Sequence, residues 1–244
     1  MIDTHAHLDM CDDVDAAVAR AREAGVTSIL TVGTAPAGWA RALALAERHA
    51  GVRAILGLHP HNAAEDGLDG LAALLEDERV VAVGETGLDF FRDYAPRDAQ
   101  RRAFEAQLEL AAEAGKPVVI HSRAADDDTA RTLERFDGTV VLHCFSSPHL
   151  LPAALERGYY VSFAGNATYP NATDLRLAAT QVPAERILAE TDTPYLAPQP
   201  RRGRRNEPAY VVHTLAALAG ARGERPEELE RQIEGNARRV FGLA

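Results

Sequence analysis

Two histidines separated by one residue, His5 and His7, follow a short stretch at the start of the chain. On an extended backbone, residues i and i+2 point to the same side, so both imidazoles can face one point at the end of a strand. Imidazoles paired in this way are ready metal ligands. An H-x-H pair is also typical of a solvated strand end, and only further ligands elsewhere in the chain distinguish the two interpretations.

Histidines and carboxylates recur directly after later apolar stretches of the sequence. If each stretch is a parallel strand of one barrel, all of these residues lie at the same end of it. Scattered surface histidines have no reason to fall repeatedly at that position, so the joint pattern predicts a metal centre. The residues concerned are His59 and His61, Glu85, His121, His143, and Glu190 to Asp192.

The mixture of nitrogen and oxygen ligands suits zinc, manganese or magnesium, and a carboxylate such as Glu85 can bridge two ions. Two ions ~3.5 to 4 Å apart would polarise a substrate oxygen and lower the pKa of bound water. Asp192 follows the last apolar stretch, where it could bind one ion and accept the proton of the attacking water. The pattern therefore predicts metal-dependent hydrolysis.

Eight short apolar stretches alternate with helical patterns along the chain. Arg97 to Ala114, for example, is typical of a helix that is entered at a proline, Pro96, and ends at a glycine, Gly115. Eight strands with helices between them predict an α/β fold, a single (β/α)8 TIM barrel over residues 1–244. A doubly wound open sheet is the alternative, but its G-x-G-x-x-G turn is missing after the first strand. After the strand that carries His5, the expected strands are 26–32, 52–58, 80–83, 116–120, 139–142, 159–163 and 186–189.

Composition fits this interpretation. The chain has 244 residues, of which 46% are hydrophobic, and a barrel of this type has roughly 250. Cys11 and Cys144 are the only cysteines, so neither a disulfide framework nor a zinc knuckle is expected, which favours the cytoplasm. The sequence has no secretory signal and no apolar run long enough to span a bilayer. A formal net charge of −10 argues against nonspecific adhesion to nucleic acid, but it allows a phosphate held by metal and local arginines.

Arginines and aromatic residues follow several of the expected strands. Arg92, Arg123 and the cluster 201–205 could ring the metal face and bind phosphates, although the cluster could instead be a solvated loop. Cys144 next to His143 invites a nucleophilic role, but metal-activated water already supplies the nucleophile, so a structural thiol is favoured. Three aromatic side chains could stack on a terminal base or cover the barrel: Phe90, Phe91 and Tyr94.

Several motifs occur in one order along the chain. They are Asp3 to Asp9, Gly57 to His61, Gly84 to Asp89, Pro117 to Arg123, His143 to Ser146, Glu190 to Pro194, Arg205 to Pro208 and Asn236 to Phe241. This ordered combination resembles the TatD family of metal-dependent deoxyribonucleases and hydrolases, within the amidohydrolase-like barrels. The resemblance implies an exonuclease that cleaves DNA phosphodiester bonds from an end, here expected to act 3′ to 5′, with single-stranded DNA or DNA ends as its partner. Thr86 departs from the family, in which an apolar residue is more usual.

The resemblance also implies roles for individual residues and two divalent metal ions, Mg²⁺, Mn²⁺ or Zn²⁺. Glu85 takes the bridging position that a modified lysine fills in many barrel amidohydrolases, and Glu85 and Asp192 are the expected catalytic residues. Lys116 begins the fifth strand, at the wrong end of the barrel for that bridging role. The expected metal ligands are His5, His7, Glu85, His121, His143 and Asp192. The expected substrate-binding residues are His59, His61, Arg92, Arg123 and Arg205, although His59 and His61 could also bind metal or donate protons.

Two other classes of function remain open on the sequence. The same ligands would serve a metal-dependent hydrolase of a small amide, ester or lactone, which the acidic net charge mildly favours. A barrel that binds metal without turnover is the third class. A complete ligand set together with a candidate base, Asp192, argues against it.

Overall fold

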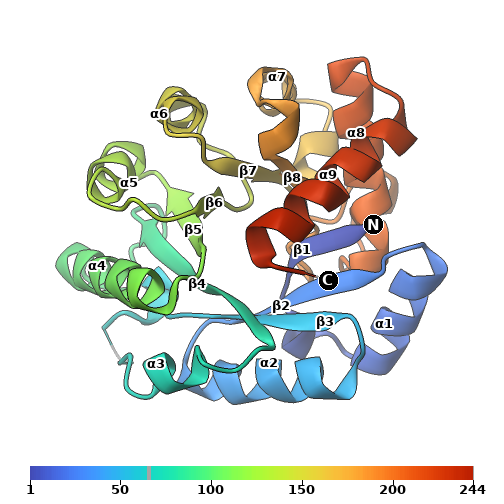
Figure 1. Ribbon diagram of the computed structural model, residues 1–244. Helices are drawn as coiled ribbons and strands as arrows, with labels where there is room; N and C mark the ends of the chain where they lie inside the picture. The colour runs from blue at the N-terminus through green and yellow to red at the C-terminus, as the bar shows by residue number, and fades with distance from the viewer. Residues whose placement is uncertain (65–66, 244) are drawn as a thin grey trace.

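Eight parallel strands form one sheet in the sequential order β1 to β8, and the helices between them lie on its outside (Figure 1). The computed structural model describes residues 1–64 and 67–243, so residues 65, 66 and 244 of the expected domain lie outside the described residues. A parallel bridge between Ala6 and Thr193 joins β1 to the segment after β8. The sheet therefore nearly closes on itself, which confirms the predicted (β/α)8 barrel.

The strands lie close to the expected ranges. They are β1 (Ile2–Ala6), β2 (Ser28–Gly33), β3 (Val52–Leu56), β4 (Val80–Asp89), β5 (Val118–Arg123), β6 (Val140–Leu142), β7 (Tyr160–Phe163) and β8 (Ile187–Ala189). The helices are α1 (Val14–Glu23), α2 (Pro36–Arg48), α3 (Leu71–Leu74), α4 (Arg97–Ala114), α5 (Asp126–Leu133), α6 (Leu151–Glu156), α7 (Thr173–Gln181), α8 (Val211–Arg222) and α9 (Pro226–Phe241).

Helix α4 shows how local sequence sets the outer layer. It spans the predicted range, begins after Pro96 and ends at Gly115, which adopts a left-handed conformation with φ of 61°. Its buried face includes Phe104 and Leu108, which belong to the large apolar cluster between strands and helices. The helix therefore covers the strands with the face that its apolar periodicity predicts.

A second apolar cluster fills the barrel itself. Neighbouring strand residues alternate between the two clusters: Ile29 of β2 belongs to the outer one and Leu30 to the inner one. Val240 and Phe241 of α9 join the inner cluster and line a cavity of 690 Å³ with residues at the start of β4 and β5. Helix α9 therefore covers the end of the barrel at which the strands begin, which leaves the opposite end, called the mouth below, for the site.

Strand β4 extends well beyond the expected end at Val83 and reaches Asp89. Two glycines permit the extension because their φ angles are positive, 153° at Gly84 and 129° at Gly87. A Cβ atom on Gly84 would lie 2.7 Å from the Val119 carbonyl oxygen of β5. The register between β4 and β5 shifts between Gly84 and Thr86, so a bulge lies at Glu85. The expectation that Glu85 follows the strand was therefore wrong, because polar and glycine residues continue it.

Candidate metal centre

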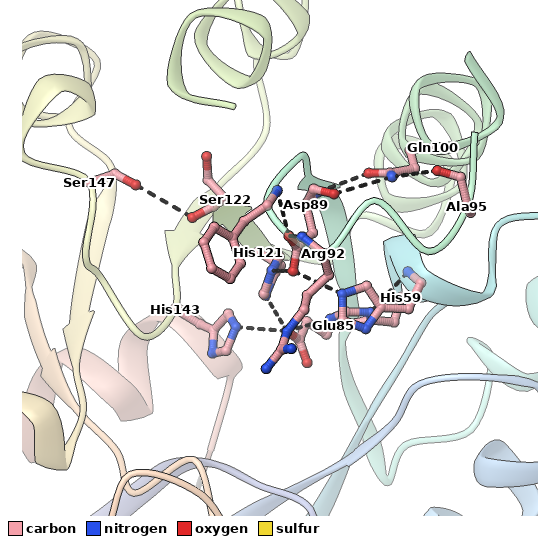
Figure 2. A network of polar contacts seen from close by, with 12 residues as sticks. His59, Glu85, Asp89, Arg92, Ala95, Gln100, His121, Ser122, His143 and Ser147 are labelled. Atoms are coloured by element: carbon pink, nitrogen blue, oxygen red, sulfur yellow. Dashed lines mark hydrogen bonds and ion pairs between the residues drawn. The ribbon is translucent and has the colours of Figure 1, made fainter. Parts of the chain in front are cut away.

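The Glu85 carboxylate lies at the centre of five histidine rings at the mouth of the barrel, and it is almost completely buried. Figure 2 shows three of these rings directed toward it: His121 of β5, and His59 and His143, which follow β3 and β6. To Glu85 Oε2 the distances are 3.4 Å from His5 Nε2 and 3.7 Å from His7 Nε2. To Glu85 Oε1 they are 3.3 Å from His59 Nε2, 2.9 Å from His121 Nδ1 and 2.8 Å from His143 Nε2.

Barrel closure brings the sixth expected ligand, Asp192, to this cluster. The backbone N–H of Asp192 donates to the His5 carbonyl oxygen at 2.9 Å, and the N–H of His7 donates to the Thr193 carbonyl oxygen at 2.8 Å. Asp192 adopts a left-handed conformation with φ of 56°, and its Oδ1 atom lies 3.5 Å from His7 Nε2. Backbone hydrogen bonds between β1 and the segment after β8 therefore place His5 and His7 beside Asp192.

The donor atoms fit a divalent cation. Three sets each place one donor atom per residue within 4.8 Å of the others: His5, His143 and Asp192; His5, His7 and Glu85; and His59, Glu85 and His121. Among the residues that the structure describes, both ring nitrogens of His5 are buried without a hydrogen-bond partner. Burial of unpaired polar atoms costs free energy, which a bound cation would offset. Imidazole and carboxylate donors suit zinc, manganese or magnesium.

The protonation of the cluster also favours a cation. Burial by itself would raise the pKa of Glu85, but His143 and His59 and the bond to His121 outweigh it and hold the pKa well below its usual range. Burial lowers the pKa of His143, whereas Glu85 and Glu190 raise it well above its ordinary value. Glu85 is therefore ionised, and a cation would displace the proton from His143.

Two carboxylates outside the expected ligand set orient the histidines. Glu190 Oε1 accepts a hydrogen bond from His143 Nδ1 at 3.1 Å and from the Cys144 backbone N–H at 2.8 Å. Asp89 Oδ2 lies 3.2 Å from His121 Nε2. Each carboxylate thus turns the opposite ring nitrogen toward Glu85. The signal was present in the sequence, since both residues lie in motifs that carry an expected ligand, but spacing does not tell a ligand from a residue that orients one.

Helix α4 fixes the end of β4 with two buried glutamines. Gln100 Oε1 accepts the N–H of Asp89 at 2.9 Å, as Figure 2 shows. Gln107 Nε2 donates to Thr86 Oγ1 at 2.6 Å, and Gln107 Oε1 accepts the N–H of Leu58 at 2.7 Å. The bond to Thr86 explains the unusual threonine, because its hydroxyl gives Gln107 Nε2 a buried acceptor. The glutamines hold β3 and β4 in the register that the site requires.

His59 presents an N–H group rather than a lone pair to the cluster. Its Nδ1 accepts the backbone N–H of His61 at 3.1 Å, so the neutral ring carries its proton on Nε2. Burial lowers the pKa of His59 to about 4, against the opposing charge of Glu85, so the ring is neutral near pH 7. Of the roles left open for His59, this tautomer favours hydrogen-bond donation over metal binding, because a cation at Nε2 would require that proton to leave.

The other candidate substrate residues lie around the cluster. His61 Nε2 is 2.8 Å from Asp89 Oδ2. Arg92 follows β4, and its backbone N–H donates to Asp89 Oδ1 at 2.8 Å. Arg123 ends β5. Arg205 is farther along the rim, where its Nη2 donates to the Met10 carbonyl oxygen at 2.6 Å.

The remaining reactive side chain is the thiol of Cys144. Burial raises its pKa well above the ordinary value, and Asp192 and Glu190 add to the shift. Thiolate is the nucleophilic form, so the structure favours the structural role expected for this residue.

The sequence model of the family described as TatD related DNase matches residues 2–242. The chain belongs to this family. It is 40% identical over 263 residues to the uncharacterized metal-dependent hydrolase TatD of Mycobacterium tuberculosis, covering 100% of this chain and 98% of that protein. It is 41% identical over 244 residues to the 3′-5′ ssDNA/RNA exonuclease TatD of Pantoea ananatis, covering 95% and 94%.

A solved structure agrees with this assignment. The TatD homologue YjjV of Escherichia coli superposes with a TM-score of 0.92 at 34% identity, over 100% of this chain and 98% of that one. Membership in the TatD family, inferred from the motifs, is therefore confirmed. Within the described residues, no helix of this family member is both long and apolar enough to cross a membrane.

Proposed function

We propose that this TatD family member is a divalent-metal-dependent exonuclease that removes nucleotides from the 3′ end of single-stranded DNA. The observation that carries the proposal is the Glu85 carboxylate, enclosed by five imidazoles, one of which, His7, also lies beside Asp192. The exonuclease name of the Pantoea ananatis relative supports the reaction and its direction. The proposed ligands of two ions are His5, His7, Glu85, His121, His143 and Asp192.

Divalent ions held by these ligands would polarise the phosphate and lower the pKa of bound water. Asp192, whose side chain is 13% exposed, accepts the proton of the attacking water at a carboxylate oxygen. His59 donates its Nε2–H to a phosphate oxygen of the substrate. Its neutral state suits this role, because it donates without repelling the cations beside it.

Four further side chains bind the strand. Arg92 and Arg123 pair with phosphates on the side of β4 and β5. His61 binds the strand on the same side, where its bond to Asp89 holds the ring in place. Arg205 binds phosphates farther from the cleaved bond, on the side of β1 and β8.

Degradation of single-stranded DNA labelled at either its 5′ or its 3′ end tests the proposal. Purified protein is incubated with Mg²⁺, Mn²⁺, Zn²⁺ or chelator, in parallel with a matched RNA strand and a panel of small amides, esters and lactones. We expect metal-dependent release of nucleotides, with the 3′ label released first, and no activity in chelator. Release of the 5′ label first would show that the enzyme degrades the strand from its 5′ end. Turnover of the small substrates with no cleavage of either nucleic acid would overturn the nuclease assignment.

A further inference from the structure

Exposed apolar side chains gather at the mouth of the barrel. Among the described residues, five large apolar or aromatic side chains are exposed, and four of them follow β1, β4 or β8. Clustered exposed apolar surface marks an interaction site more often than scattered exposure does. The four are Met10, Phe91, Tyr94 and Tyr195.

The ring of Phe91 lies near two guanidinium groups, those of Arg92 and Arg123. The Arg123 guanidinium lies 4.2 Å from the centre of its ring, and the Phe91 backbone N–H donates to Asp89 Oδ1 at 3.0 Å. The side chain nevertheless remains 63% exposed. Its neighbour Phe90 differs, because it packs against the apolar core with Arg97 at 4.4 Å from its ring. Of the two roles left open for these aromatics, Phe90 therefore covers the barrel, whereas Phe91 faces outward and is free to stack on a base.

The position of Phe91 is fixed relative to the metal centre. The same Asp89 carboxylate that binds the Phe91 N–H lies 2.8 Å from His61 Nε2 and 3.2 Å from His121 Nε2. His121 in turn lies 2.9 Å from Glu85. One buried carboxylate thus ties the backbone of Phe91 to two histidines of the site, which places its side chain beside the cluster.

We propose that Phe91, supported by Arg123, stacks on an unpaired base beside the cleaved phosphate and thereby selects single-stranded ends. The inference rests on the proposed exonuclease function. Every base has a π-face that an aromatic ring can stack on, whatever the sequence, and an adjacent guanidinium adds a cation–π contact and attracts phosphate. Within a duplex, pairing and stacking hold each base against its neighbours, whereas an unpaired base is free to turn onto the ring.

The test compares Phe91→Ala, Phe91→Trp and wild type on two single-stranded DNAs. One carries ordinary nucleotides throughout, and the other carries abasic residues at the last two positions of the attacked end. Leu177→Ala is the matched control, because Leu177 is 57% exposed but lies in α7, on the outside of the barrel. For Phe91→Ala we expect KM on the ordinary strand to rise about 10-fold with kcat unchanged, since stacking is lost. Phe91→Trp should keep the wild-type KM.

On the abasic strand, wild type and Phe91→Ala should have the same KM, and Leu177→Ala should match wild type on both strands. Equal KM values for wild type and Phe91→Ala on the ordinary strand would overturn the inference while the exonuclease function stands. An equal loss on both strands would also overturn it, because Phe91 would then shape the metal centre. If wild type releases no nucleotide from either strand, the exonuclease function fails and the inference with it.

Discussion

The two ends of strand β4 differ in how completely their charged and polar side chains are hydrogen-bonded. Near its start, Lys116 Nζ donates to the Val80 carbonyl oxygen at 2.6 Å, and Asp77 bonds Arg79 through both carboxylate oxygens. At the mouth, Glu85 is enclosed by five imidazoles. The buried ring nitrogens of His5 have no hydrogen-bond partner among the described residues.

The difference shows which end can act on a ligand. Charges at the start of the strand are satisfied within the protein, so they contribute to stability alone. Polar groups at the mouth are incompletely satisfied, and a bound cation would complete them. This is the division of labour expected of a (β/α)8 barrel. It also explains why Lys116 cannot fill a bridging position, since its amine is bound at the opposite end of β4 from Glu85.

The sharpest contrast comes from the same substitution at the two ends. Glu85→Gln should abolish nearly all turnover and release bound metal, because a neutral amide cannot balance cations among five imidazoles. Glu78→Gln, an exposed position beside the start of β4, should retain the turnover and metal content of wild type. Nucleotide release measures turnover, and elemental analysis measures metal content. Full activity of Glu85→Gln would show that this carboxylate is not required for metal binding or catalysis.

The next effect in size is expected for the proposed proton acceptor. Asp192→Asn keeps the shape of the side chain but removes its basicity, so kcat should fall by about 10²- to 10⁴-fold. Circular dichroism checks that the barrel is intact. The exposed Asp174 of α7 provides the control substitution, Asp174→Asn. If kcat is unchanged in Asp192→Asn, another group must accept the proton of the attacking water.

Residues that orient ligands should have an intermediate effect. In Glu190→Gln the amide can still contact His143 but no longer favours a proton on Nδ1, so metal affinity should fall by about 10- to 100-fold. Calorimetric titration of the metal-free protein with Zn²⁺ or Mn²⁺ measures the change. Wild-type affinity in this variant would mean that His143 is oriented by packing alone.

At the opposite end, a substitution should change stability alone. Lys116→Met keeps the aliphatic part of the side chain and removes the bond to the Val80 carbonyl oxygen. The free energy of unfolding should fall by about 1 kcal/mol, with kcat unchanged. Urea unfolding monitored by circular dichroism gives the first quantity. A lower kcat in the folded variant would contradict the separation of the two ends.

The smallest effect should appear only in acid. Arg79 lowers the pKa of Asp77 to about 2 from 3.8, so the folded state binds this proton more weakly than the unfolded state. The resulting stabilisation is fully present above about pH 4 and is lost as the pH falls through about 2. The difference in urea midpoint between wild type and Asp77→Asn should therefore shrink from pH 6 to pH 2. A difference that stays constant would contradict the pairing.

Much of the site was predictable because it depends on local chemistry and on strand count. Alternation of apolar stretches and helices gave the barrel, and the barrel rule placed His5, His121 and His143 at one end. The range of α4 followed from Pro96 and Gly115. These features depend on backbone propensities and on residue type, which the sequence states directly.

Other features depend on contacts between residues far apart in the chain. The extension of β4 past Val83 requires the close approach of Gly84 to Val119, which no local pattern reports. Asp89 and Glu190 have the same residue types as Glu85 and Asp192, and only their hydrogen bonds mark them as orienting residues. The neutral tautomer of His59 depends likewise on the His61 backbone.

The sequence by itself determined the fold class, the family and the set of donor residues, because these follow from residue type and order. Tertiary structure decided which carboxylate stands at the centre, which ring nitrogen faces it and which aromatic ring stays exposed. The physical reason is that protonation and hydrogen bonding depend on distance and burial. Those are set when barrel closure brings β1 against the segment after β8.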